Sequence, residues 1–301
     1  REKKRTNCNL TFTSIKDNKL IMGKSLESLS SNENLLLGIV CGAASKTCNY
    51  PLLVFKNYSQ QGLGFPSLVP WVVYRGLPMA MLNLGGTTAL QFWFTGFFQK
   101  GIRKFSNNDA YVQMGGSFLG GLASGIPCSI WELTMIQQQR FGGSIISAPS
   151  RIFSQYGLHG LFRGLAMTLG RESIFTLSML GITPAIQKEL VERSGLDSSS
   201  ALAGGALSGA IFAATITHPL DTIKTCLQGD VQGIKFKTHA QTFSLLIQES
   251  HGSFLGLFKG LNWRIALIST TFFLVNDFKD RFAPFLFPRR LSTPHNSKKG
   301  D

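Results

Sequence analysis

The feature that most limits the architecture of this chain is a pattern that occurs three times along it. In each copy an apolar segment rich in small residues runs into an internal proline, at Pro51, Pro127 and Pro219. A second apolar segment then begins at an aromatic residue followed by a basic residue, glycine and leucine. These tetrapeptides are Tyr74-Arg75-Gly76-Leu77, Phe162-Arg163-Gly164-Leu165 and Phe258-Lys259-Gly260-Leu261. Because such self-similarity marks repeat architectures, the sequence predicts three tandem copies of a two-helix unit.

Six apolar, glycine-rich segments result from this pattern. They cover residues 34–56, 77–99, 112–137, 164–187, 200–227 and 261–287. Each is close to or longer than the ~20 residues that cross a hydrocarbon core as a helix. Internal prolines and charged residues interrupt them, which favours helices that line a polar interior over simple lipid-facing helices. We therefore expect an all-α membrane protein with six transmembrane helices.

The connecting loops differ in length between the three copies. From the proline to the following helix-start glycine there are 25, 37 and 41 residues. We expect the first and shortest loop to lack the short helix that the other two can hold. The predicted parts are a basic N-terminal tail, three repeats and a basic C-terminal tail, with the bounds 1–32, 33–106, 107–195, 196–287 and 288–301.

The charge balance is unusual and excludes several classes of protein. Charged residues make up only 15% of the chain, yet the formal net charge is +14, and 44% of the residues are hydrophobic. Intrinsic disorder is excluded by that apolar content. A nucleic-acid-binding protein is not expected, because the basic residues lie in the tails and between apolar segments instead of along one face. This distribution fits an anionic membrane surface.

No sequence motif points to catalysis or to a bound metal. The five cysteines are odd in number and form no CxxC pair, so we predict neither a disulfide framework nor a zinc site. The chain also lacks HExxH, GxSxG, Walker and dinucleotide-binding motifs. We expect no enzyme activity, no catalytic residue, no metal and no cofactor.

The third copy carries the clearest motif. It reads Pro219-Leu220-Asp221-Thr222-Ile223-Lys224, with Gln228 nine residues after the proline. Together with the basic-glycine helix starts, this motif resembles the mitochondrial carrier family, over nearly everything between residues 33 and 287. The resemblance implies a six-helix bundle with threefold pseudosymmetry in the mitochondrial inner membrane, with both tails on the intermembrane side. It also implies kinks at the three prolines, and a matrix gate of ion pairs between the odd helices, braced by the glutamines.

The other two copies of the motif are incomplete. In the first, Leu53 stands in place of the acid. In the second, Ser129 replaces the acid, Ile136 replaces the glutamine and Glu132 stands where a base belongs. On the opposite side, the family closes with an acid and a base near the ends of the even helices, and two of the three corresponding stretches, 94–98, 182–186 and 276–280, lack the acid. We expect closure on that side to depend on packing.

Four charged residues lie at corresponding depths of the odd segments, and their charges cancel. A charge inside a membrane span is costly, so it normally finds a partner or a water-filled cavity. The family's pairing rule joins Asp221 to Lys56 and leaves Glu132 to Lys224; the alternative is that all four are only hydrated at the matrix-side interface. The residues of the expected matrix gate are Lys56, Gln60, Glu132, Asp221, Lys224 and Gln228.

Candidate substrate contacts lie nearer the middle of the segments. Lys46, within Ser45-Lys46-Thr47, resembles a phosphate-contacting lysine of nucleotide-transporting members such as the ADP/ATP carrier. Arg171-Glu172 instead resembles a pair in amino-acid-type carriers, so the two clues point to different substrates. Asn83 and Gln91 are further polar candidates. We expect Lys46 and Arg171 to face one central cavity and to attract an anion; the alternative is an internal pair with Glu172 or another acid, without a ligand.

Glycines have two expected roles. The pairs with GxxxG spacing allow close helix packing; they are Gly38 and Gly42, Gly116 and Gly120, and Gly205 and Gly209. The three helix starts offer unpaired backbone N–H groups beside a basic side chain, a ready anion site. In the family such starts hold cardiolipin phosphates, and the alternative is that the bases only extend to the membrane interface. The expected lipid-binding residues are Arg75, Gly76, Arg163, Gly164, Lys259 and Gly260.

Two functions follow from these expectations. The first is a carrier that moves a small anionic or zwitterionic metabolite, similar to a nucleotide, carboxylate or amino acid, by alternating access. The second is a transport-inactive relative that serves as a structural or assembly subunit of a larger inner-membrane complex. The intact third motif, Lys46, Gln91 and Arg171 favour the first; the incomplete motifs and the short first loop favour the second.

Overall fold

The computed structural model describes residues 31–194 and 198–288. Residues in these ranges form helices, turns and loops and no β-strand, which confirms the all-α prediction. Most of the two predicted tails, and the predicted boundary between residues 195 and 196, lie outside the described residues. The first described helix begins at Ser31, two residues before the predicted start of the first repeat.

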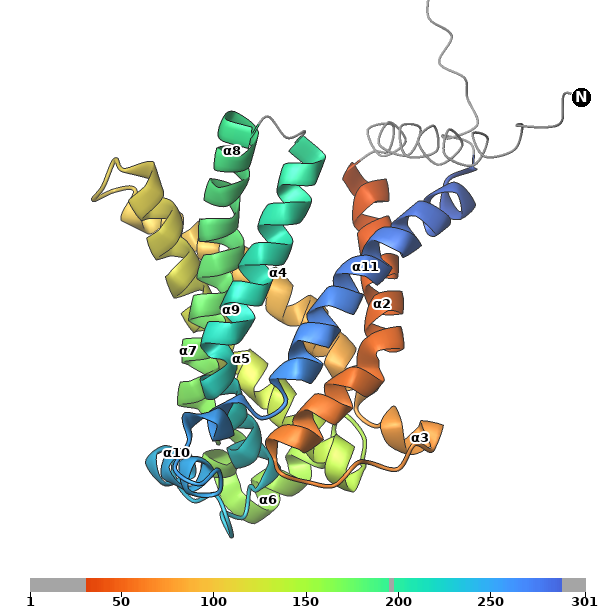
Figure 1. The fold of residues 1–301 in the computed structure, drawn as a ribbon, viewed down its shortest axis with the longest axis vertical. Helices are drawn as coiled ribbons and strands as arrows, with labels where there is room; N and C mark the ends of the chain where they lie inside the picture. Colours follow the sequence, from red (N-terminus) through yellow and green to blue (C-terminus); the bar gives the residue numbers. More distant parts are fainter. Residues whose placement is uncertain (1–30, 195–197, 289–301) are drawn as a thin grey trace, which may run out of the picture. The chain divides into compact units, whose positions relative to one another are not determined.

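All six predicted apolar segments are helical, apart from Gly164 and Phe287 at the ends of two of them (Figure 1). The long odd-numbered helices are α2 (Ser31–Gln60), α5 (Asp109–Phe141) and α9 (Ser198–Gly229). The even-numbered segments are α4 (Leu77–Ile102), α7 (Leu165–Thr176) with its continuation, and α11 (Leu261–Leu286). Pro51, Pro127 and Pro219 lie inside the odd helices, where each removes a backbone donor, and the kinks expected there stay predictions.

The fourth segment departs from a plain helix. After Thr176 the backbone passes through a π-helical stretch, η1 (Leu177–Ile182), before it resumes as α8 (Thr183–Ser194). Two hydrogen bonds join this stretch to other helices. Gln113 donates to the Leu180 carbonyl at 2.9 Å, and the Ser178 hydroxyl donates to the Gly209 carbonyl at 3.0 Å.

The connecting segments carry four further short helices. They are α3 (Pro70–Val73), α6 (Ser147–Leu161), α10 (His239–Gln248) and the 3-10 helix η2 (Phe254–Phe258). The first loop holds only the single turn α3, which directly precedes the helix start as η2 does in the third loop, and it has no counterpart of α6 or α10 among its described residues, as expected. A single turn forms there because Pro70 sits at the start of α3 with its φ angle already suited to a helix.

The chain divides into two compact units. The first contains the described residues 31–48 and 271–288, in which Leu37 and Cys41 of α2 pack with Ala283 of α11. Within this unit the Ser45 hydroxyl donates to the Thr271 carbonyl at 3.4 Å. The second unit, Asn49–Thr270, contains everything else.

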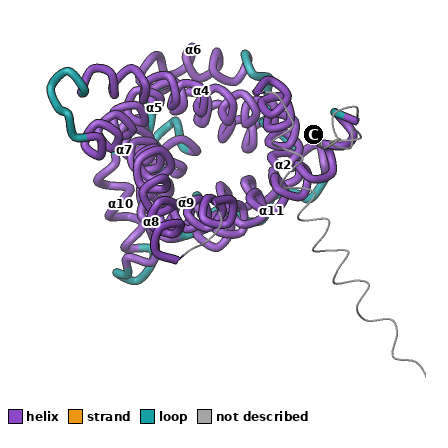
Figure 2. The backbone as a smooth tube through the Cα atoms, turned by 90° about the horizontal axis from the view of Figure 1, so that it is seen from above, coloured by secondary structure: helices purple, strands orange, loops and turns teal. Residues whose placement is uncertain are grey.

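In the second unit, α4 packs on α5, α5 on α7 and α7 on α9, in the order seen in Figure 2. Glycines of α5 permit this closeness. A Cβ atom at Gly120 would lie 2.7 Å from the backbone nitrogen of Thr95, and one at Gly121 would lie 2.7 Å from the Cα of Ser173. The packing role predicted for Gly116 and Gly120 is confirmed, whereas a Cβ at Gly38 or Gly42 would meet no described atom within 4 Å, so that role is wrong for the first pair.

By length and composition, α5 alone among the described helices is long and apolar enough to cross a membrane. Its most apolar window has a mean hydropathy of 1.2, and 61% of that window is buried inside the protein.

Candidate functional site

A cluster of charged side chains lies in the interior of the second unit. We call it the charged cluster, and it takes residues from α2, α5, α7, α9 and α11. Six of its members are buried, and the side chain of the seventh, Arg171, is 15% exposed. Its members are Lys56, Glu132, Arg171, Glu172, Asp221, Lys224 and Arg264.

Two ion pairs join the C-terminal halves of the odd helices. The Lys56 ammonium lies 2.6 Å from Asp221 Oδ2 and links α2 to α9. The Lys224 ammonium lies 2.9 Å from Glu132 Oε2 and links α9 to α5. Both expected pairings are thus confirmed, including the one in which the acid and the base have exchanged helices.

The two glutamines of the motif act differently. Gln60 donates to Asp221 Oδ2 at 2.9 Å, so it supports the first ion pair directly. Gln228 donates to the backbone carbonyl of Ser129 at 3.1 Å and lies 3.4 Å from its hydroxyl. Since Ser129 stands where the family has an acid, this glutamine binds neutral oxygens there.

Arg171 is held by acids of the protein. Its Nη2 donates to Glu132 Oε2 at 2.8 Å and to the neighbouring Glu172, and its Nε lies 3.8 Å from Asp221 Oδ1. Gln91 of α4 donates to the other oxygen of Glu172 at 2.7 Å. Of the two alternatives for Arg171, the structure has the internal pair, and it connects α7 and α4 to the odd helices.

Arg264 of α11 is the member that the sequence analysis missed. Its Nη1 lies 3.8 Å from Asp221 Oδ2, and its Nη2 donates to the Thr217 hydroxyl at 2.9 Å. The ring of His218, whose other nitrogen faces the Lys259 carbonyl at 3.0 Å, lies 3.5 Å from the guanidinium. The cost of an arginine inside an apolar segment could have identified it, just as it identified Lys56.

The charged cluster contains more positive than negative charge. Four cations and three carboxylates leave one positive charge in excess among its described members. A low-dielectric interior strengthens the attraction of this excess for an anion, because fewer water dipoles screen it.

Comparison with known proteins agrees with the motif and its geometry. The sequence model described as mitochondrial carrier protein matches residues 195–285. A probable mitochondrial 2-oxodicarboxylate carrier of Dictyostelium discoideum is 26% identical over 75% of this chain and 82% of its own. The mitochondrial S-adenosylmethionine carrier protein of Mus musculus is 26% identical over 78% of this chain and 88% of its own length. The mitochondrial glycine transporter of Candida glabrata is 27% identical over 78% of this chain and 92% of its own length.

These similarities support membership of the mitochondrial carrier family. The members of this family are transporters and not enzymes. The confirmed pairs of the charged cluster occupy the positions that the family motif gives to ion pairs.

The remaining substrate candidates of this carrier, Asn83 and Lys46, are not members of the charged cluster. Asn83 accepts a hydrogen bond from Thr87 of its own helix at 2.9 Å and is half-buried. Lys46 is also half-buried and belongs to the first unit. The expectation that Lys46 and Arg171 face one cavity joins the two units and stays a prediction.

The helix-start glycines of the carrier are required by the backbone. Gly76, Gly164 and Gly260 have φ angles of 82°, 79° and 82°, in the left-handed region that favours glycine. Each also lies against an odd helix or its side chains. A Cβ atom at Gly164 would lie 3.3 Å from Gln228 Cγ, and one at Gly260 would lie 3.2 Å from the Lys56 carbonyl.

The basic residues beside these glycines differ in their contacts with the rest of the protein. Arg163 donates to the backbone carbonyls of Leu227, at 2.9 Å, and of Phe236. Lys259 lies 3.4 Å from a carboxylate oxygen of Glu249. Arg75 is exposed. Two of the three predicted lipid-binding bases therefore already have protein partners.

One group of side chains in the carrier has the spacing of metal ligands. Cys128 Sγ and carboxylate oxygens of Glu132 and Glu172 lie within 4.8 Å of one another. Lys224 and Arg171 already bind these carboxylates, so a divalent ion would meet two positive charges. The donor set does not fit a metal.

Proposed function

We propose that this carrier crosses the mitochondrial inner membrane through six helices, arranged as three two-helix repeats. We further propose that it moves a small carboxylate-bearing metabolite, anionic or zwitterionic, by alternating access. The observation that carries this proposal is the charged cluster, with its one excess positive charge. Exposed aromatic side chains on α4 support contact with lipid: Phe92, Trp93 and Phe97 are 60%, 65% and 64% exposed.

In this proposal the charged cluster is the matrix gate. Its ion pairs link α2 to α9 and α5 to α9, and Asn57 donates to Gln139 at 2.8 Å and links α2 to α5. All three odd helices are therefore joined to one another near their C-terminal ends. A substrate carboxylate competes with Asp221, Glu132 and Glu172 for the cations, and this differential binding shifts the population toward the open gate.

The substrate class is argued from the cations and from the relatives. The three relatives carry, by name, a 2-oxodicarboxylate, S-adenosylmethionine and glycine. Each of these compounds has a carboxylate, the group that an arginine fork binds with two parallel hydrogen bonds. We assign that role to Arg264, whose nearest acid oxygen is 3.8 Å away. Lys46 stays a separate candidate, as a single positive charge for the anion.

The test is uptake into proteoliposomes that hold the full chain. We expect uptake or exchange of at least one labelled 2-oxodicarboxylate, amino acid or S-adenosylmethionine, and we expect Arg264→Gln and Lys46→Ala to abolish it. The matched control is Arg103→Gln, which removes an arginine paired with Asp109 at the protein surface and should transport normally.

The alternative function is a transport-inactive structural or assembly subunit. One observation favours it. Asp277 is the acid of the stretch 276–280, where the family closes on the side opposite the matrix gate, and it pairs at 2.8 Å with Arg281 of its own helix instead of with another helix. Absence of exchange for every class of carboxylate by correctly inserted protein, together with migration in a large complex in mild detergent, would replace the carrier proposal with this one.

A further inference from the structure

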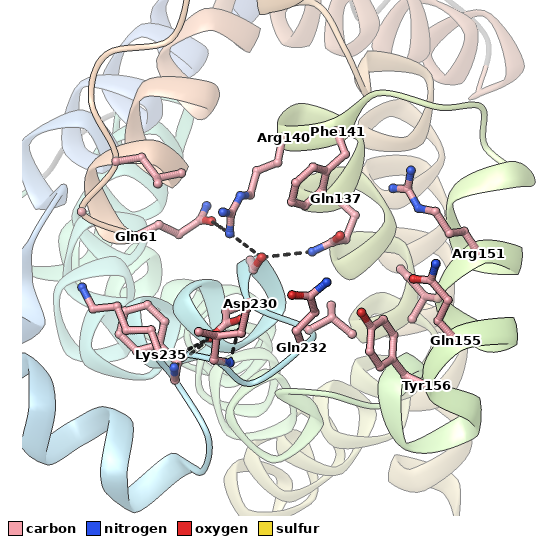
Figure 3. A pocket seen from close by; sticks show the side chains of 17 residues that line it. Gln61, Gln137, Arg140, Phe141, Arg151, Gln155, Tyr156, Asp230, Gln232 and Lys235 are labelled. Atoms are coloured by element: carbon pink, nitrogen blue, oxygen red, sulfur yellow. Dashed lines mark hydrogen bonds between the residues drawn. The ribbon is translucent and has the colours of Figure 1, made fainter.

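A cavity lies in the second unit, where α5 and α9 end beside α6. It has a volume of about 580 Å³, within the range of small-molecule sites. Arg140 and Phe141 line it from α5, Arg151 and Ile152 from α6, and Val231 from the loop after α9 (Figure 3). None of these residues belongs to the charged cluster.

Two arginines in the cavity lie near the same aromatic ring. The guanidinium carbons of Arg140 and Arg151 lie 5.1 Å and 5.8 Å from the centre of the Phe141 ring, which is drawn between them in Figure 3. The Nη2 atom of Arg151 is buried and has no hydrogen-bond partner among the described residues. A buried donor without a partner is costly, so a ligand that accepts from it is favoured.

Arg140 also has donors to spare. Its Nη1 donates to Gln61 Oε1 at 3.3 Å and to the Gly229 carbonyl, which links the ends of α5, α2 and α9. Its Nε and Nη2 make no hydrogen bond to a described residue. A ligand can therefore bind Arg140 while the link between the helix ends persists.

The acid in the cavity does not neutralise these arginines. Asp230 accepts backbone N–H groups of its own loop, from Ile234 at 3.2 Å, Lys235 at 2.7 Å and Phe236 at 2.8 Å. Partial burial opposes ionisation, but these three donors hold the pKa of Asp230 below its usual range, so the carboxylate is charged and occupied. Lys235, the third cation of the cavity, lies 2.6 Å from Glu249.

We propose that this cavity binds a small organic phosphate. The Arg151 guanidinium, whose Nη2 has no partner among the described residues, receives the phosphate dianion, since its fork matches the phosphate oxygens. Arg140 adds a second positive charge to the cavity, and the apolar body of the ligand lies against Phe141, Ile152 and Val231. The site is separate from the charged cluster. Its ligand need not be the transported substrate.

The test is calorimetric titration of the purified full chain in a neutral detergent with phenyl phosphate. Inorganic phosphate lacks the apolar body and benzoate lacks the second charge, and both should bind more weakly. Arg151→Gln should weaken phenyl phosphate binding by about tenfold or more, since a charged hydrogen bond of the usual strength is lost. Arg151→Lys keeps the positive charge but loses the guanidinium fork, so its affinity for phenyl phosphate should lie between those of the unmodified chain and of Arg151→Gln.

Two control variants decide where the probe binds. Arg103→Gln removes a surface arginine and should bind as the unmodified chain does, and so should Arg264→Gln, which alters only the charged cluster. Unchanged affinity in Arg151→Gln would overturn the proposal. So would loss of binding in Arg264→Gln with binding retained in Arg151→Gln, and that result would leave the transport proposal standing.

The phosphate group could belong to a lipid headgroup or to a soluble compound, and a titration in nanodiscs distinguishes these two sources. Neutral nanodiscs with and without phosphatidic acid are titrated with phenyl phosphate. A soluble ligand is indicated if the affinity is equal in both, and a lipid headgroup if phosphatidic acid competes in the unmodified chain. Failure of phenyl phosphate to bind in neutral nanodiscs would contradict both versions.

Discussion

At the scale of single residues, Asp221 has the densest set of partners in the charged cluster. Its Oδ2 accepts from Lys56 and Gln60 and lies 3.8 Å from Arg264, and its Oδ1 lies 3.7 Å from Lys224. The carboxylate is fully buried. Removal of its charge therefore leaves several buried cations without their compensation.

We predict that Asp221→Asn lowers the free energy of unfolding by about 3–5 kcal/mol, the usual cost of removing one partner of a buried ion pair. Chemical denaturation of the purified protein in detergent measures it. Asp277→Asn is the matched control: it breaks an exposed pair with Arg281 and should cost at most about 1 kcal/mol. Equal losses in the two variants would contradict a compensating role for Asp221.

At the scale of elements, the starts of α4, α7 and α11 place a left-handed glycine against an odd helix. The same contact therefore fixes where an even helix begins and how closely it approaches its neighbour. An added methyl group meets both the disfavoured φ angle and the facing side chain.

We predict that Gly164→Ala destabilises the protein by about 1–3 kcal/mol, because alanine is strained at a φ of 79° and its Cβ would lie 3.3 Å from Gln228 Cγ. Gly96→Ala is the control. Gly96 lies inside α4 with no neighbour within 4 Å of an added Cβ, so alanine should leave stability unchanged or raise it by up to about 1 kcal/mol. Thermal unfolding compares the two, and the reverse order would refute the argument.

We also predict that cardiolipin stabilises the purified carrier, because each of these helix starts places the positive end of a helix dipole beside a basic residue, which favours a phosphate. At 100 times its dissociation constant, a lipid that binds only the folded state adds about 2.7 kcal/mol. Melting curves with cardiolipin and with a neutral lipid at equal mole fraction measure the effect. Arg75→Gln should reduce the stabilisation by cardiolipin more than Arg103→Gln does, since Arg75 is an exposed base at a helix start. Identical melting curves in cardiolipin and in the neutral lipid would disprove specific binding of cardiolipin.

The sequence predicted these elements well because both of its signals are local. Apolar length and the repeated glycine and proline positions placed all six long segments. The cost of buried charge indicated that Lys56 and Lys224 need a partner or water, and the pairing rule of the family that the motif resembles named the partners. Arg171 was harder, since its partner Glu132 lies 39 residues away on another helix and only the packing of α5 on α7 brings them together. The π-helical stretch η1 depends on Gln113 and Ser178 contacts that no local pattern encodes.

At the scale of the whole molecule, the excess positive charge of the charged cluster makes membrane voltage relevant to transport. With a monoanion bound, the cluster and its cargo sum to zero, so the loaded step moves no net charge through the field. With a dianion bound, the loaded complex carries one negative charge. Each charge moved across 100 mV changes the energy by about 2.3 kcal/mol.

We therefore predict that exchange of one monoanion for an identical one proceeds at the same rate with and without a potassium diffusion potential across proteoliposomes. Exchange of a dianion for itself should change its rate when the potential is applied. A rate that changes with the potential for both anions would mean that the cluster is neutral when it is empty. In that case the membrane potential of a respiring organelle would act on the loaded carrier. The charge count given above instead predicts that the potential acts on the empty carrier, which bears the excess positive charge.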